Sequence, residues 1–345
     1  MERLDVGVLA PHTGMAAGPG SLTEVAVAAE QLGFGSLWVG DHIVLPAEQE
    51  SAYPYGAEDA DDGYEVPSDR PFLEATTCLA FLAAVTERIR LGISVAILPY
   101  RAPAVWAKTV GTLDVLAGGR IVLGAGVGWL AEEFDVLGAD FASRGRRTDE
   151  TLRFLRAAWA ATGPVEFDGE FCRTDRMFVR PSRGPGASPP PVWVGGNGAP
   201  ALRRTAELGD VWHPHVRGVP PDRITSGLTE IRSRAAAAGR EDVAFGAAVH
   251  CPLVLADRVA GNPWELGRVE GPPAFLADTL ARYRAAGLTH VVLTFGGSAA
   301  RRIDVLERVA EVLEPEIARA GDAAVPAGRT SRRTAGVVEE GANGE

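Results

Sequence analysis

The chain has 345 residues, of which 46% are hydrophobic and 23% are charged, a composition typical of a globular protein with one large domain or two ordinary ones. Its formal net charge of −11 argues against nucleic acid and anionic membranes as partners, because the sequence shows no cluster of Lys and Arg that would bind them. The three cysteines lie far apart in no metal-binding pattern, so we expect free thiols, no metal site and a soluble, cytoplasmic protein.

Short apolar runs rich in Val and Ile alternate along the chain with segments of helical spacing. These runs predict eight strands, which begin at Leu4, Ser36, Leu91, Ile121, Val192, Val211, Phe245 and His290. The helical segments are expected at Ser21–Gln31, Pro71–Glu87, Ala104–Leu116, Ala131–Leu137, Arg146–Ala161, Ala199–Leu208, Asp222–Ala238, Pro272–Ala286 and Ala299–Ala318. Because the strand segments are almost continuously apolar, we expect parallel strands that are buried on both faces.

Local signals add detail to two of the helices. Ser21 is a good N-cap residue, since Glu24 follows it at the spacing of a capping box. In the helix from 104 to 116, the helical spacing predicts one inner face, made of Val105, Thr109, Thr112, Leu113 and Leu116.

Three segments do not fit the alternation of strands and helices. Leu45–Arg70 is long, acidic and rich in turn residues, and a loop of this length is usually functional or mobile. Residues 165–179 predict a two-stranded excursion with a turn at Asp168-Gly169. The tail over residues 321–345 has no hydrophobic period, so we expect it to be disordered.

Eight strand–helix units over residues 1–320 favour a (β/α)8 barrel with insertions. An open, doubly wound sheet is the alternative, but the first strand is not followed by the GxGxxG turn of that fold. In a barrel, the loops after the strands meet at one end. The glycine turns Gly124–Gly128 and Gly195–Gly198, the pair Asp41-His42, the long loop and His213 should therefore converge there.

Each of these features has two interpretations from the residues alone. Gly195–Gly198 can bind a phosphate through its backbone N–H groups, or it is an ordinary tight turn. In Asp41-His42, the imidazole can transfer protons near neutral pH, or a His–Asp contact holds the strand end. Trp129 either covers a flat ring or packs in the core, whereas the pocket wall or the surface is favoured for His213 and His215.

Three segments, 91–134, 144–159 and 189–214, resemble the bacterial luciferase-like superfamily, and specifically its branch of deazaflavin (coenzyme F420)-dependent oxidoreductases. The resemblance extends from about Leu4 to Ala318. It implies a barrel with insertions, a flavin or deazaflavin at the carboxyl end of the strands with its phosphate at a glycine turn, and hydride transfer at the ring. It also implies a small-molecule substrate and a homodimer.

The resemblance assigns roles residue by residue. Asp41 and His42 would lie against the ring and the substrate, with His42 as the proton donor or acceptor. Ser94-Val95 matches a strand bulge behind the ring that is often a non-proline cis peptide. The residues that match cofactor-binding positions are Ser94, Val95, Gly126, Val127, Gly128, Gly195, Gly196, Asn197 and Gly198.

The chain departs from the sugar-phosphate dehydrogenases of this branch at two positions. Trp129 stands where they carry an acidic Glu, and Pro46 stands near the place of their tryptophan. These departures argue against sugar-phosphate oxidation and leave the substrate open. The first hypothesis is an F420-dependent oxidoreductase that acts on a small organic molecule. The alternatives are an FMN-dependent monooxygenase that uses O2 and a flavin-binding protein without chemistry.

Overall fold

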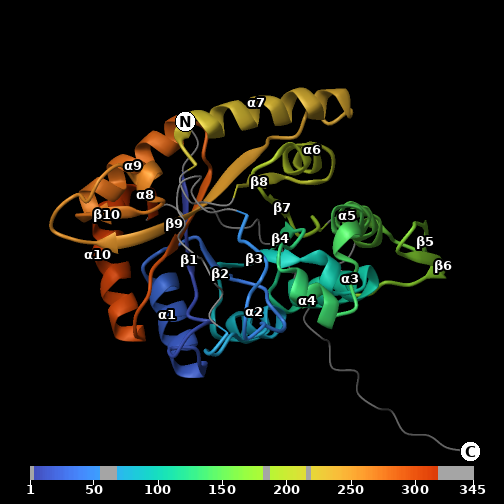
Figure 1. Cartoon of the computed structure of the whole chain (residues 1–345), viewed down its shortest axis with the longest axis horizontal. Coiled ribbons are helices and arrows are strands. Elements are labelled where there is room, and N and C mark those ends of the chain that lie inside the picture. The colour runs from blue at the N-terminus through green and yellow to red at the C-terminus, as the bar shows by residue number, and fades with distance from the viewer. Residues whose placement is uncertain (1–3, 55–67, 182–186, 215–218, 318–345) are drawn as a thin grey trace, which may run out of the picture.

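The computed structural model describes residues 4–54, 68–181, 187–214 and 219–317 (Figure 1). Within these ranges, parallel strands follow one another around a closed barrel in chain order. They are β1 (Asp5–Leu9), β2 (Ser36–Val39), β3 (Arg90–Ile97), β4 (Ile121–Gly126), β7 (Val192–Gly195), β8 (Val211–His213), β9 (Gly246–Leu255) and β11 (His290–Thr294). Pairing of β8 with β9 and of β11 with β1 closes the ring, so the predicted (β/α)8 barrel is confirmed and the open-sheet alternative is wrong.

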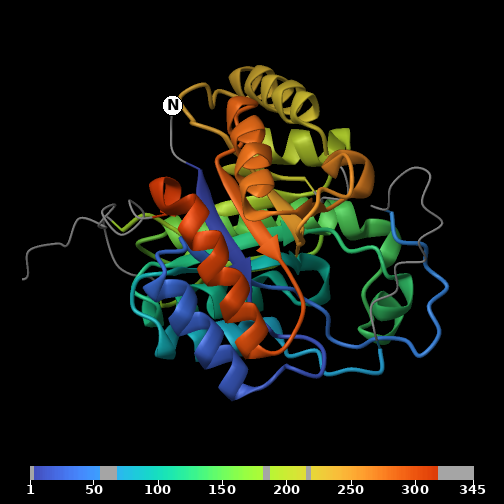
Figure 2. The same cartoon turned by 90° about the vertical axis from the view of Figure 1, so that its left-hand side faces the viewer.

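Helices cover the outside of the barrel, and two views show α1 and α10 side by side on it (Figures 1 and 2). The helices are α1 (Pro19–Gln31), α2 (Ala75–Val85), α3 (Pro103–Leu116), α4 (Ala131–Val136), α5 (Arg144–Ala160), α6 (Ala199–Leu208), α7 (Pro221–Ala237), α8 (Pro263–Leu266), α9 (Pro273–Ala285) and α10 (Ala299–Ile317). Short 3-10 helices, η1 (Leu98–Tyr100) and η2 (Phe141–Ser143), precede α3 and α5. The bounds of α6 agree with the prediction, and those of most other predicted helices differ by one or two residues.

Two additions extend this barrel. The expected antiparallel hairpin consists of β5 (Val165–Asp168) and β6 (Arg173–Met177) and projects beyond α5 in Figure 1. The carboxylate of Glu150 on α5 holds the turn of the hairpin by accepting backbone N–H groups at 2.7 Å from Glu170, Phe171 and Cys172. A strand that the sequence did not predict, β10 (Val269–Gly271), pairs with β9; three residues are too few to show a strand pattern.

The inside of the barrel is filled by side chains. They form a cluster of Trp38, Val122, Trp193, Val211, Ala248 and Val292. The ring centroids of Trp38 and Trp193 are 4.4 Å apart, and neither side chain is more than 2% exposed. A second, larger cluster lies between the strands and the helices. Because the interior is packed, space for a ligand exists at the ends of the strands rather than through the barrel.

The inner face of α3 agrees with the predicted one only at Leu113. Val105 and Leu116 are 49% and 67% exposed, whereas Trp106, Val110 and Leu113 are buried. The indole N–H of Trp106 donates to the carbonyl of Leu98 at 2.9 Å, which fixes the side of the helix that faces the barrel. The prediction failed because apolar residues occur on both sides of this helix and spacing alone could not rank them.

Two helix starts also differ from the prediction. α1 begins at Pro19 with Gly18 as its N-cap residue, and the hydroxyl of Ser21 donates to backbone carbonyls before and at the cap instead of capping the helix. α2 begins after Glu74, whose carboxylate accepts the N–H of Thr77 at 2.7 Å. The residues just before Glu74 pair instead with the loop that follows β1.

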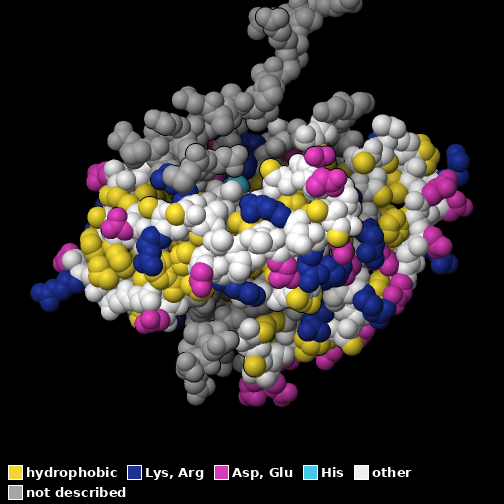
Figure 3. Space-filling model, turned by 90° about the horizontal axis from the view of Figure 1, so that it is seen from above, with side chains coloured by type: hydrophobic (Ala, Val, Ile, Leu, Met, Phe, Trp, Pro, Cys, Tyr) yellow, Lys and Arg dark blue, Asp and Glu magenta, His cyan; other side chains and the backbone are white. Residues whose placement is uncertain are grey.

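No helix in the described part of the chain is long and apolar enough to cross a membrane. On the face seen in Figure 3, Lys and Arg side chains lie interspersed with Asp and Glu. Residues 55–67 of the long loop, His215 and the tail predicted at 321–345 lie outside the described residues.

Gly92 tests how tightly the barrel interior is packed. A Cβ atom at Gly92 would lie 2.2 Å from the Trp38 ring, so Gly92→Ala should lower the free energy of unfolding by about 1–3 kcal/mol. Gly145→Ala on α5 is the control, because its Cβ would meet no atom closer than 3.9 Å and stability should hold or rise slightly. Denaturant unfolding measures both variants, and equal stabilities would contradict a filled interior.

Candidate active site

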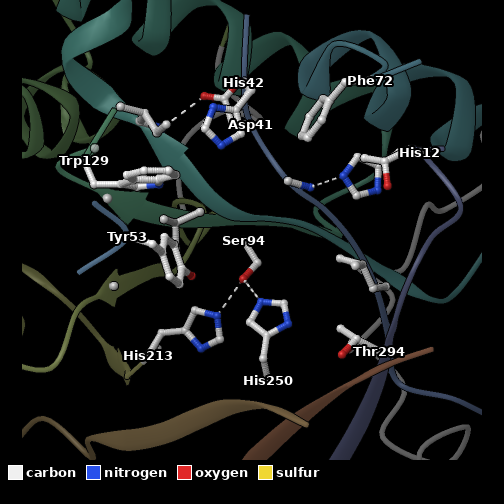
Figure 4. A pocket seen from close by; sticks show the side chains of 18 of the residues that line it. His12, Asp41, His42, Tyr53, Phe72, Ser94, Trp129, His213, His250 and Thr294 are labelled. Carbon is white, nitrogen blue, oxygen red and sulfur yellow. Dashed lines mark hydrogen bonds between the residues drawn. The ribbon is translucent and has the colours of Figure 1, made fainter. Parts of the chain in front are cut away.

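A cavity of about 500 Å3 opens at the carboxyl ends of the barrel strands (Figure 4). Its wall includes most of the site residues that the sequence predicted, namely Asp41, His42, Ser94, Val95, Gly126, Val127, Gly128, Gly195 and Gly196, together with Trp129 and His213. Asn197 and Gly198 continue the turn after Gly196 but do not line the cavity. The cavity has the size of a site for a small molecule.

Asp41, directly after β2, contacts Arg101 rather than His42. Its two carboxylate oxygens accept hydrogen bonds from the guanidinium of Arg101 at 2.9 and 3.1 Å, and one of them also accepts the backbone N–H of Ile97 at 3.0 Å. Burial raises the pKa of Asp41, and the guanidinium of Arg101 opposes this shift. The His–Asp contact that the sequence left as one alternative is therefore not formed, and an ion pair between Asp41 and Arg101 joins the ends of β2 and β3.

The partner of His42 is Glu133 on α4, 91 positions later in the chain. The Nδ1 atom of His42 lies 2.7 Å from a carboxylate oxygen of Glu133, which is 1% exposed. The same carboxylate accepts hydrogen bonds from the backbone N–H groups of Ile43 and Val44 and from the hydroxyl of Tyr100. Burial alone would raise the pKa of Glu133, but the hydrogen bond from His42 and the other donors lower it below its ordinary value.

This arrangement fixes the tautomer of His42. A carboxylate that accepts from several donors has no proton to give, so the proton of this hydrogen bond is on Nδ1 of His42. In the neutral ring, Nε2 is then the atom that can accept a proton. The sequence analysis missed Glu133, although its position in the first turn after a predicted strand-end glycine turn places it at the mouth of a barrel.

The adjacent Glu132 holds the next part of the same loop. It accepts the backbone N–H groups of Glu50 and Ser51 at 2.6 and 2.8 Å and the hydroxyl of Ser51 at 2.6 Å. The Ser51 oxygen in turn accepts the N–H of Ala131 at 3.0 Å and so satisfies the first turn of α4. Burial raises the pKa of Glu132, but these hydrogen bonds together outweigh burial and lower the pKa to about 2. Two neighbouring carboxylates thus attach the loop after β2 to α4.

The peptide bond between Ser94 and Val95 is cis, as predicted. The hydroxyl of Ser94 lies 2.6 Å from Nε2 of His213 and 2.5 Å from Nε2 of His250. His213 donates from Nδ1 to the carbonyl of Ala248 at 2.9 Å, and burial lowers its pKa to about 4. His213 is therefore neutral and accepts the Ser94 proton at Nε2, so His250 must donate to Ser94.

His12, in the loop after β1, positions the residue before Asp41. Its Nδ1 donates to the carbonyl of Ala10 at 2.9 Å, and its Nε2 accepts the N–H of Gly40 at 2.7 Å. Burial lowers the pKa of His12 to about 4, which keeps Nε2 unprotonated and able to accept. Sequence analysis assigned no role to His12 or His250, because neither stands in a recognisable local pattern. Among the described residues, no group of three or more His, Cys, Asp or Glu side chains could hold a metal ion.

Glycines form the wall at the ends of β4 and β7. Gly128 and Gly196 have φ values of +80° and +119°, which other residues rarely adopt. Gly126 and Gly195 instead make room for Val95, whose side-chain atoms would lie 2.4 and 3.0 Å from an added Cβ. Trp129 follows this wall and lines the cavity, so the alternative that it packs in the core is wrong.

The fold and the site together define a class, a (β/α)8 barrel with a ligand-sized cavity and a histidine–glutamate pair at the ends of its strands. The model of the luciferase-like monooxygenase family matches residues 4–260. The chain therefore belongs to this family of oxidoreductases and monooxygenases, as its resemblance predicted.

Several relatives can be compared along most of the chain. An uncharacterized protein of Mycobacterium tuberculosis is 32% identical over 272 residues, which cover 79% of this chain and 83% of that protein. A phthiodiolone/phenolphthiodiolone dimycocerosates ketoreductase of Mycobacterium bovis is 32% identical over 224 residues, 63% of this chain and 56% of the relative.

Solved structures are similar in fold. An F420-dependent secondary alcohol dehydrogenase in complex with an F420–acetone adduct has a TM-score of 0.70 at 18% identity, covering 90% of this chain and 99% of that chain. An EDTA monooxygenase from Chelativorans sp. BNC1 has a TM-score of 0.72 at 13% identity, and the match covers 91% of this chain and 94% of that chain. Because both kinds of enzyme match equally well, the fold does not choose between them.

Buried neutral histidines predict a stability that depends on pH. Burial lowers the pKa of His12, His213 and His290 from 6.5 to about 4. Between these values the unfolded chain binds protons that the folded chain does not, so stability is complete above pH 6.5 and is lost as the pH falls toward 4. The melting temperature should therefore drop from pH 7 to pH 5. His290→Gln, which removes one of these groups outside the cavity, should make the drop shallower, whereas an unchanged melting temperature over this range would refute the prediction.

Proposed function

We propose that this protein is an F420-dependent oxidoreductase that transfers a hydride between the deazaflavin and a small organic substrate. The observation that carries the proposal is the His42–Glu133 pair, in which a buried carboxylate 2.7 Å from Nδ1 holds an imidazole in the wall of the cavity. Interconversion of an alcohol and a carbonyl compound moves one hydride and one proton. A tautomer-fixed imidazole is suited to the proton.

The glycine turns fit such a cofactor. In the turn that follows Gly196, the side-chain oxygen of Asn197 is buried without a hydrogen-bond partner among the described residues. The guanidinium of Arg223 donates to the carbonyl of Asn197 at 3.1 Å, which places an exposed cation beside the turn for a phosphate. Gly196 admits close approach of the backbone. The residues that would hold the cofactor are Ser94, Val95, Gly126, Val127, Gly128, Gly195, Gly196, Asn197 and Gly198.

When bound, the deazaflavin supplies the hydride acceptor or donor at C5 of its ring. His42 accepts the proton of the substrate hydroxyl at Nε2 while the carbonyl forms, and it returns this proton in the reverse direction. Glu133 keeps the other nitrogen of His42 protonated and stabilises the imidazolium by its charge. Asp41 has no proton-transfer role in this scheme, because its oxygens are held by Arg101 and Ile97.

An FMN-dependent monooxygenase is the second candidate. It is supported by the description of the matching family and by the monooxygenases among the similar structures. The names of the ketoreductase relative and of the secondary alcohol dehydrogenase support the first candidate instead. Both candidates use the same cavity, so the cofactor decides between them.

Titration of the purified chain with oxidised F420 and with FMN tests the proposal. We expect F420 to bind at least about tenfold more tightly than FMN, which corresponds to about 1.4 kcal/mol. Gly196→Val should weaken F420 binding far more than it lowers the melting temperature. The turn adopts a φ of +119° at Gly196, and a Cβ atom there would block the close approach of the backbone to the cofactor. Gly239→Val is the matched control, since its φ is +68° and it does not line the cavity. Binding of FMN alone would favour the second candidate.

Substitutions of His42 and Glu133 test the proton transfer. His42→Ala should lower the rate of the chemical step about 10²–10⁴-fold and leave cofactor affinity within a few-fold. Glu133→Gln should also slow this step, whereas Glu132→Gln, which disturbs the attachment of the same loop without touching His42, should not. Single-turnover rates, melting temperatures and cofactor affinities separate the effects. A normal rate in a destabilised His42→Ala variant would show that His42 is structural.

A further inference from the structure

The cavity has two chemically different walls. The glycine wall, at the ends of β4 and β7, is the part that the proposed function assigns to the cofactor. The other groups come from the loop after β2 and from the residue that follows Gly128. Here the lining is aromatic, and we call it the aromatic wall, made of His42, Tyr53, Phe72 and Trp129 (Figure 4).

The rings of the aromatic wall stand at right angles to one another. The centroids of Tyr53 and Trp129 are 5.0 Å apart with an interplanar angle of 81°, and His42 meets Trp129 at 6.5 Å and 84°. His42 also meets Phe72 at 5.4 Å and 88°. Neighbouring rings in this wall therefore contact one another edge to face. This is the arrangement that another flat ring prefers as its surroundings.

The charges around the cavity do not favour an anion. Among the described lining residues, the charged side chains are Asp41 and Arg70. Asp41 is paired with Arg101, and Arg70 has an exposed side chain (56%) with Asp69 at 3.6 Å. A carboxylate or phosphate on the substrate would lose its hydration next to aromatic rings without gaining a buried cation.

We propose that the substrate is an uncharged aromatic alcohol or its ketone, with its ring against the aromatic wall and its oxygen at His42. This inference rests on the proposed function for the reaction, and the aromatic wall supplies the substrate class. On oxidation, the carbinol C–H bond breaks with hydride transfer to the deazaflavin, the O–H proton passes to Nε2 of His42, and the C=O bond forms. The alcohol is oxidised, the deazaflavin is reduced, and the reverse reaction consumes the same proton and hydride.

Binding of three ketones of similar size tests this class. Ligand-observed NMR titrations use acetophenone, cyclohexyl methyl ketone and 4-acetylbenzoate with the full chain, first alone and then with saturating oxidised F420. Acetophenone should bind about two- to tenfold more tightly than the cyclohexyl ketone, which is the usual contribution of an aromatic pair. It should bind at least about tenfold more tightly than 4-acetylbenzoate, because the described residues that line the cavity offer the carboxylate no buried cation. Equal affinity for either of the other two ketones would overturn the proposal.

Variants locate the binding to the aromatic wall. Trp129→Leu keeps an apolar side chain but removes a ring, so it should weaken acetophenone binding several-fold and leave the cyclohexyl ketone unchanged. Phe178→Leu is the control, because Phe178 is 68% exposed near the hairpin and does not line the cavity. A Trp129→Leu variant that binds acetophenone as the unmodified protein does would refute the assignment. The titrations without cofactor do not depend on F420, so a failure of F420 to bind would overturn the proposed function and leave the ketone ranking as a separate result.

Discussion

One buried carboxylate, that of Glu133, determines the shape of the active-site end of the barrel. It joins α4 to the loop after β2 through His42, Ile43 and Val44, and it joins both to η1 through Tyr100. A buried carboxylate without these donors would be strongly unfavourable. The hydrogen bonds to Glu133 therefore hold the segments that supply the donors in place. The same contacts that satisfy the charge also orient the imidazole of His42, the group to which we assign proton transfer.

The remaining polar side chains of the cavity are fixed in a similar way. His12 and His213 each donate from Nδ1 to a backbone carbonyl, so each presents Nε2 as an acceptor. Nε2 of His12 accepts the N–H of Gly40, and Nε2 of His213 accepts the hydroxyl of Ser94. The same hydroxyl also forms a hydrogen bond with His250. The tautomers of His12 and His213 are therefore each fixed by the backbone carbonyl that the Nδ1 atom contacts. A site with such fixed dipoles needs little reorganisation when a ligand enters it.

The sequence was sufficient to predict the fold and the location of the site. Buried parallel strands appear as continuous apolar runs, which is why the eight strand starts and the barrel could be predicted. Asp41, His42, Ser94 and the glycine turns were found because they follow strand ends or match a family motif. The same local methods failed where the outcome depended on distant contacts. The inner face of α3 is fixed by the hydrogen bond from the indole of Trp106 to the carbonyl of Leu98. The short strand β10 is stabilised by its pairing with β9.

The partners within the site could not be predicted for the same reason. Nothing near His42 in the sequence indicates that its carboxylate is 91 positions away rather than at the adjacent Asp41. Likewise, His213 and His250 meet Ser94 across 119 and 156 positions. Propensity and spacing describe neighbours within a few residues, whereas these pairs are set by the curvature of the whole barrel.

The attachment of α4 has a consequence for how the protein folds. α4 has six residues, too few for a helix that is stable by itself, and its first N–H is satisfied by Ser51 from a segment 80 positions earlier. Contacts between such distant segments form slowly, because the loop between them must close first. We therefore expect the helix and the pair formed by His42 and Glu133 to appear together, after the first four barrel strands have associated. A chain arrested before that step would contain much of its sheet but neither α4 nor the contact between His42 and Glu133.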